Sequence, residues 1–175
     1  PRRRRTHPMT PTECPKSRFS ADRIKHLEFL QATIARQAAH SFSVKGWSLT
    51  VAAALFAYTA THLEWWLALI ALVPPVVFAG LDAFYLRQER LFRQLYNSVA
   101  RPGSSVALFS MDVSEYTDPD KYPSCRLRGR AGVWRSKSWL QFHAMIIAVG
   151  VVLLGVAVIQ AFGSTEIAQC ISDAL

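Results

Sequence analysis

The residue types best suited to binding chemistry are a group of cations and one tryptophan that precede the last apolar stretch of the chain. Guanidinium groups bind phosphate oxygens, and an indole ring stacks on a nucleobase. The run therefore predicts a site for an acidic nucleotide or oligonucleotide, formed by Arg126, Arg128, Arg130, Trp134, Arg135 and Lys137. The same side chains would also suit a simple cationic anchor at the cytoplasmic end of a membrane helix.

A second set of candidate residues lies within the apolar stretches or interrupts them. Asp82 needs a partner at its expected depth, and Lys45 and Arg87 fall at the same level, so an interfacial ion pair and a pore-lining acid are both open. Two adjacent prolines should bend their helix, either as a gating hinge or as a structural kink. The polar residues would line an axis if subunits assemble around one, or hydrogen-bond between helices if they do not. The candidate pore or gate residues are Thr50, Pro74, Pro75, Asp82, His143 and Gln160.

Three apolar stretches, at about residues 44–63, 65–86 and 139–162, must position these groups. Each approaches the roughly 20 residues with which an α-helix crosses a bilayer. All 20 Lys and Arg residues lie within 2–45 and 87–137. The positive-inside rule then predicts a multi-pass membrane protein with a cytoplasmic N-terminus and an external C-terminus. In a bacterium this location would be the inner (plasma) membrane. Three core helices of a soluble protein are the alternative, which this sorting of cations disfavours.

The rest of the chain divides around these stretches. Residues 1–19 are expected to be a disordered basic arm, and 20–43 an amphipathic helix that forms either a stalk or a surface helix on the membrane. The 44–86 hairpin should continue as a helix over 87–101, giving a helical cytoplasmic collar. A linker at 102–138 should hold the basic run and one short strand or extended segment at 106–111, and 163–175 should be an external tail. The predicted fold is thus an all-α membrane protein with three transmembrane helices and a short irregular or β-containing cytoplasmic segment.

Enzyme signatures are missing from the sequence: it has no phosphate-cradling glycine loop, no paired zinc ligands and no nucleophile elbow. We therefore expect no enzyme, no cofactor and no metal. Small residues recur along the first apolar stretch at helical spacing, which favours close helix contacts within the chain or in a homo-oligomer. These residues are Gly46, Thr50, Ala53, Ala57 and Ala60. The net charge of +8 favours contact with anionic lipids.

Four sequence segments occur in an order that resembles a group of small bacterial membrane proteins: HLEFLQ at 26–31, SFSVKGW at 41–47, GLDAFYLRQER at 80–90 and FSMD at 109–112. Their layout is similar to the SLATT-type membrane effectors and to the channel effector of the Hailong anti-phage defence system. The resemblance covers about residues 20–112. It implies gating by a single-stranded DNA or a cyclic or oligo-nucleotide ligand, made by an operon-encoded nucleotidyltransferase. The third apolar stretch departs from the simple two-helix pattern.

Together these features predict an oligomeric ion channel or pore-forming effector, of bacterial anti-phage defence, that is gated by an acidic nucleotide or oligonucleotide. A non-conducting membrane anchor or adaptor that recruits a cytoplasmic partner is the alternative, and a plain nucleic-acid tether is a third.

Overall fold

The computed structural model describes residues 20–126 and 132–172, which form three long helices and three short 3-10 turns. The turns lie between the second and third helices and are η1 (Ser114–Thr117), η2 (Pro123–Cys125) and η3 (Val133–Arg135). Neither described range contains a β-strand. The all-helical class is therefore confirmed, whereas a short strand at 106–111 is not formed. A strand needs a partner ladder, and the described residues offer none, so this segment is irregular.

Helix α1 (Ala21–His62) is one uninterrupted helix of 42 residues. It begins after Ser20, whose Oγ accepts a hydrogen bond from the Arg23 backbone N–H at 3.3 Å and so caps the first turn. It ends before Leu63, which takes a left-handed conformation with φ of 45°. At 1.5 Å per residue α1 is about 63 Å long, roughly twice the thickness of a bilayer core. The expected amphipathic segment at 20–43 therefore continues into the apolar segment at 44–63 without a break, and the stalk and the surface helix both stay predictions.

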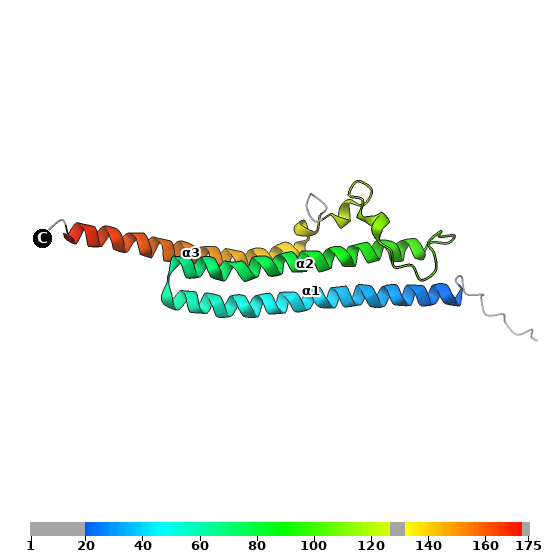
Figure 1. The fold of residues 1–175 in the computed structure, drawn as a ribbon, viewed down its shortest axis with the longest axis horizontal. Coiled ribbons are helices and arrows are strands. Elements are labelled where there is room, and N and C mark those ends of the chain that lie inside the picture. Colours follow the sequence, from blue (N-terminus) through cyan, green and yellow to red (C-terminus); the bar gives the residue numbers. More distant parts are fainter. Residues whose placement is uncertain (1–19, 127–131, 173–175) are drawn as a thin grey trace, which may run out of the picture.

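Helix α2 (Trp65–Val99) returns antiparallel to α1 and lies beside it along its length (Figure 1). Pro74 and Pro75 lie inside α2, and the helix assignment continues through them. Their missing N–H groups leave two carbonyls of the preceding turn without the usual helical partner. The buried side chains of α2 are spaced by three or four residues except at Asp82, which is followed directly by Ala83 and then by a gap up to Leu91. They are Ala68, Ala71, Pro75, Ala79, Asp82, Ala83, Leu91, Leu95 and Val99. The seam, which is the interface between α1 and α2, is therefore narrow along the first half of α2, and larger apolar side chains fill it along the second half.

Helix α3 (Lys137–Ser172) packs mainly on α2, and its C-terminal part continues past the α1–α2 turn (Figure 1). Gly150 marks a close approach of all three helices. A Cβ atom at this position would clash with the Leu72 side chain and would lie 2.8 Å from Cζ of Phe56. A larger residue here would therefore force the Leu72 and Phe56 side chains to shift, so space and not backbone conformation favours glycine.

Among the described helices, α2 and α3 are long and apolar enough to cross a membrane, over Trp65–Val99 and Lys137–Gly163. The apolar half of α1 does not reach the same hydropathy, because serine, threonine and small residues dilute it. Two such helices are compatible with a membrane protein. The first of the three expected spans, at 44–63, stays a prediction.

The loop module, residues 100–126, folds back against the far ends of α1 and α2 (Figure 1). Its Tyr116 and Cys125 join a core of buried side chains that also contains Leu30, Leu91, Leu95 and Val99. Side chains of α1 and α2 hold the module through its backbone carbonyls. His26 Nε2 lies 2.9 Å from Ser110 O. Arg87 Nε donates to Cys125 O at 3.1 Å, and Arg90 donates to Ser124 O at 2.7 Å. The module is thus fixed to α2 just beyond its membrane-compatible half.

Candidate functional site

A buried polar cluster joins all three helices, and the carboxylate of Asp82 is its centre. The Asp82 side chain is fully buried, with 0% of its surface exposed. Lys45 Nζ lies 2.7 Å from both carboxylate oxygens. Ser41 Oγ donates to Oδ1 at 2.5 Å, and His143 Nε2 lies 2.9 Å from Oδ2. Each helix therefore contributes at least one member of the cluster: Ser41 and Lys45 come from α1, Asp82 from α2 and His143 from α3.

The positions of these groups follow from helix geometry. Ser41 and Lys45 are four residues apart, so they share one face of α1, and Lys45 Nζ also donates to Ser41 Oγ at 2.9 Å. Lys45 precedes Leu63 by as many residues as Asp82 follows Glu64, so a tight antiparallel hairpin brings the two to the same level.

The α3 side of the cluster is fixed by Trp139, one turn before His143. Trp139 Nε1 donates to the backbone carbonyl of Ala79 at 3.0 Å. Its ring centroid is 5.3 Å from that of His143 on one side and 5.3 Å from that of Trp134 on the other. The edge of Phe142 packs against the same imidazole. The histidine is therefore held in an aromatic shell and presents one nitrogen to the carboxylate.

The electrostatics of the cluster depend on the proton of His143. A neutral imidazole that donates through Nε2 carries no proton on Nδ1. Nδ1 is buried and has no hydrogen-bond partner among the described residues. With this tautomer the Asp82 and Lys45 charges cancel, and the cluster is neutral. Burying a carboxylate costs several kcal/mol unless charged and hydrogen-bonding partners offset it, and here three donors do so.

The sequence-based candidates separate into those that meet in this cluster and those that do not. Asp82 forms an ion pair with Lys45, which was one of the two predicted interpretations. His143 is brought to the same carboxylate, and this pairing was not predicted. Thr50 is exposed and donates to the Gly46 carbonyl of its own helix at 3.1 Å. Gln160 is also exposed and lies far along α3, whereas Pro75 is buried in the seam.

The basic run is only partly described, because Arg128 and Arg130 lie outside the described residues. Arg126 lies 3.5 Å from the exposed carboxylate of Asp120. Trp134 stacks on Trp139, which favours the anchoring interpretation for this ring. Arg135 ends η3 and Lys137 begins α3. Of the described members of the run, Arg126 is paired with Asp120, and Arg135 and Lys137 are exposed to solvent.

The sequence contained a usable signal for part of the cluster. The hairpin register places Lys45 opposite Asp82, and the spacing of four adds Ser41. Nothing comparable pointed to His143, because α3 follows a long connection whose length does not set a register. The described residues contain no group of three or more His, Cys, Asp or Glu side chains that could hold a metal ion.

No protein-family model, curated protein or solved structure matches this chain. The function is therefore argued from the geometry of the cluster and of the surfaces around it.

Proposed function

We propose that the protein is an oligomeric membrane channel or pore-forming effector whose gate is the Ser41, Lys45, Asp82 and His143 cluster. The observation that supports this most directly is the fully buried Asp82, which holds the three helices of a protomer together. Ionisable side chains within membrane helices are costly, and they commonly mark ion pathways or gates. An acidic ligand near the basic ends of the helices would shift the balance between closed and open arrangements.

The outer face of α1 supports assembly into an oligomer. Gly46, Thr50, Ala53, Ala57 and Ala60 are all exposed in the protomer, whereas the opposite face of α1 packs on α2. A small-residue face allows close helix contact in lipid. In a ring of subunits, this face would meet a neighbour and place the Thr50 hydroxyl near the axis.

The buried ion pair in the cluster strongly favours the helix arrangement that keeps it intact. Removing one partner from a buried ion pair typically costs about 3–5 kcal/mol, because the remaining charge is left uncompensated. An arrangement that keeps the pair is therefore strongly favoured over one that breaks it without replacement. A gate of this kind has two discrete states, which a ligand can bias only by binding one state more tightly than the other.

The cations that would bind a ligand lie close in sequence to the cluster. Arg135 ends η3 and Lys137 begins α3, eight and six residues before His143. Arg87 holds the loop module little more than one turn beyond Asp82. A single-stranded DNA or nucleotide bound by Arg135 and Lys137 would therefore act on the start of α3 next to the cluster. Anti-phage defence, as the setting of this activity, rests on the resemblance of layout alone.

Single-channel recording in planar bilayers tests the proposal. The purified wild-type protein should give unitary currents that change when short single-stranded DNA is added to the side of the loop module. Lys45→Met should change the open probability. Asp118→Asn, which removes a carboxylate from an exposed loop, should leave the currents unchanged. Absence of currents from a demonstrably intact oligomer, with and without DNA, would contradict the channel.

A membrane adaptor is the second candidate, and one surface favours it. Phe29 and Phe109 are 51% and 48% exposed, and their ring centroids are 6.1 Å apart at the edge of the loop module. Phe109 is held at φ of 61°, a conformation that is uncommon for a residue with a bulky side chain. An exposed aromatic pair is a suitable contact for a protein partner. If bilayers stay silent, loss of a co-purifying partner in Phe29→Ser would favour this alternative.

A further inference from the structure

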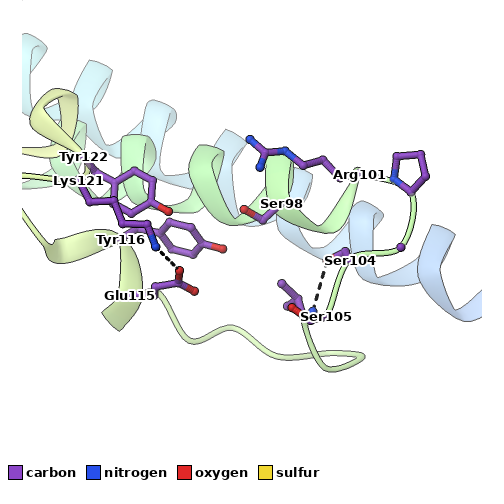
Figure 2. Close-up of a pocket in the computed structure, with 11 residues that line it drawn as sticks. Ser98, Arg101, Ser104, Ser105, Glu115, Tyr116, Lys121 and Tyr122 are labelled. Atoms are coloured by element: carbon purple, nitrogen blue, oxygen red, sulfur yellow. Dashed lines mark hydrogen bonds and ion pairs between the residues drawn. The ribbon is translucent and has the colours of Figure 1, made fainter.

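A polar pocket of about 370 Å³ lies at the end of α2 farthest from the α1–α2 turn, separate from the 126–137 basic run. It is bounded by the last turn of α2, by the tight turn at 101–104, and by the segment from η1 to η2 (Figure 2). The volume falls within the range of small-molecule sites. Its polar lining consists of hydroxyl groups and three charged side chains: Ser98, Ser104, Ser105, Tyr116, Tyr122, Arg101, Lys121 and Glu115.

Tyr116 shows that the pocket is built into the fold. Its side chain is only 3% exposed, and its ring packs in the core that joins the loop module to the helices. The Tyr116 hydroxyl points into the pocket toward Ser98 and Ser104 (Figure 2). Its oxygen is not one of the buried side-chain atoms that lack a partner, so the ring is buried while the hydroxyl stays open to solvent in the pocket. The hydroxyl can therefore donate a hydrogen bond to a ligand oxygen.

The charges of the pocket favour an anion. Arg101 makes no ion pair with any described residue, and it lies beside Ser98 at the rim (Figure 2). Lys121 Nζ lies 2.8 Å from Glu115 Oε1, and this carboxylate raises the pKa of Lys121, so the ammonium stays charged at neutral pH. The lining therefore carries one net positive charge.

The end of a helix normally carries partial negative charge, which would oppose an anion here. Arg23 offsets this effect, because its Nε donates to the carbonyl of Val99, the last residue of α2, at 3.0 Å.

We propose that this pocket binds a small soluble phosphate ester. The phosphate would lie between Arg101 and Lys121, where its oxygens would accept hydrogen bonds from the hydroxyls of Ser98 and Tyr116. Guanidinium and hydroxyl donors are the usual partners of phosphate oxygens. A phospholipid headgroup offers the same chemistry, but Val99 lies about 26 Å beyond Asp82 along α2, which takes the pocket away from the bilayer surface. Binding does not require conduction, whereas control of a gate by this pocket rests on the proposed function.

Isothermal titration calorimetry on the full chain in phosphatidylcholine nanodiscs tests the site, with adenosine 5′-monophosphate and inorganic phosphate as probes and uncharged adenosine as the control. Both anions should release heat and adenosine should not. Arg101→Gln should weaken binding of the nucleotide at least about tenfold, through loss of a charge-assisted contact. Tyr116→Phe, which keeps the ring in the core, should weaken it about fivefold. Arg36→Gln removes the same charge from α1 outside the pocket and should leave the affinity unchanged.

Three results would overturn the site: no heat from either anion, equal affinity of Arg101→Gln and the wild type, or an equal loss in Arg36→Gln, which would indicate nonspecific charge. Phosphatidylglycerol nanodiscs that abolish nucleotide binding would assign the pocket to a lipid headgroup instead of a soluble ester. Melting curves from circular dichroism establish that each variant is folded. If the nucleotide binds but bilayers show no current, the pocket is supported and the channel is contradicted. If currents appear without nucleotide binding, the channel is supported and the pocket is contradicted.

Discussion

Removing Lys45 should destabilise the protein more than neutralising its partner Asp82. In Lys45→Met the methionine replaces the aliphatic stem, but Asp82 keeps a charge that is 0% exposed and has only Ser41 and His143 as donors. Leaving one member of a buried pair uncompensated costs about 3–5 kcal/mol. In Asp82→Asn the amide oxygen can replace Oδ1 and accept from Ser41, and the amide N–H in the place of Oδ2 can donate to His143 Nε2 when the imidazole proton moves to Nδ1. The Lys45 side chain, already 16% exposed, can move its ammonium toward water. We expect a loss of about 1–2 kcal/mol for this variant.

The double variant decides between this explanation and simple loss of contacts. Lys45→Met with Asp82→Asn contains neither charge, so its stability should lie near that of Asp82→Asn and above that of Lys45→Met alone. For a chain of this size, 1 kcal/mol corresponds to roughly 2–4 °C in Tm, so Lys45→Met should melt about 6–20 °C below the wild type. Thermal unfolding in detergent micelles, followed by circular dichroism, measures all four proteins. If the losses of the two single variants add in the double variant, the buried-charge reasoning is wrong.

Two further predictions concern packing and pH. Gly150→Ala should lower the free energy of unfolding by about 1–3 kcal/mol, because the new Cβ meets the Leu72 and Phe56 side chains. Gly155→Ala is the control, since a Cβ there has nothing within 4 Å. Chemical unfolding compares the two variants, and equal stabilities would mean that α3 packs differently. Asp112 accepts a hydrogen bond from the Ser114 N–H at 2.8 Å, which lowers the pKa of this exposed carboxyl. The stability that ionised Asp112 gives to the loop module is therefore present at neutral pH and is lost as the pH falls through the lowered pKa. Asp112→Asn should flatten that part of an acid titration of the protein monitored by tyrosine fluorescence. An unchanged titration would remove Asp112 from the acid response.

How far the sequence predicted the site depends on which helix a residue occupies. The turn between α1 and α2 is so short that counting outward from it aligns Lys45 with Asp82. The same counting cannot be applied to α3, because 37 residues separate Val99 from Lys137 and their described part contains only short 3-10 turns. What positions α3 is the fit of Gly150 against Leu72 and the hydrogen bond from Trp139 to Ala79, and both are features of the folded state.

The basic residues show a second limit. A sequence shows where cations are, but not whether they point to solvent or to a carbonyl. Arg23, Arg87 and Arg90 all donate to backbone carbonyls at the end of α2 or in the loop module, so they act as structural braces. Arg101 had no place among the predicted ligand residues, yet it lines a pocket and makes no ion pair with a described residue.

If the pocket controls the proposed gate, the contacts that join it to the cluster set a requirement on the ligand. Tyr116 and Cys125 belong to one core, and the carbonyls next to Cys125 hold Arg87 and Arg90 on the stretch of α2 that follows Asp82. Moving a two-state gate from 1:99 to 99:1 takes about 5.5 kcal/mol of differential binding. A charge-assisted hydrogen bond contributes about 1.5–3 kcal/mol, so one contact that differs between the states is too little and two to four suffice. The pocket offers that number, in Arg101, Lys121 and the hydroxyls of Ser98 and Tyr116, and an oligomer would repeat them in every subunit. A ligand that engages only Arg101 should therefore bind without changing the gate.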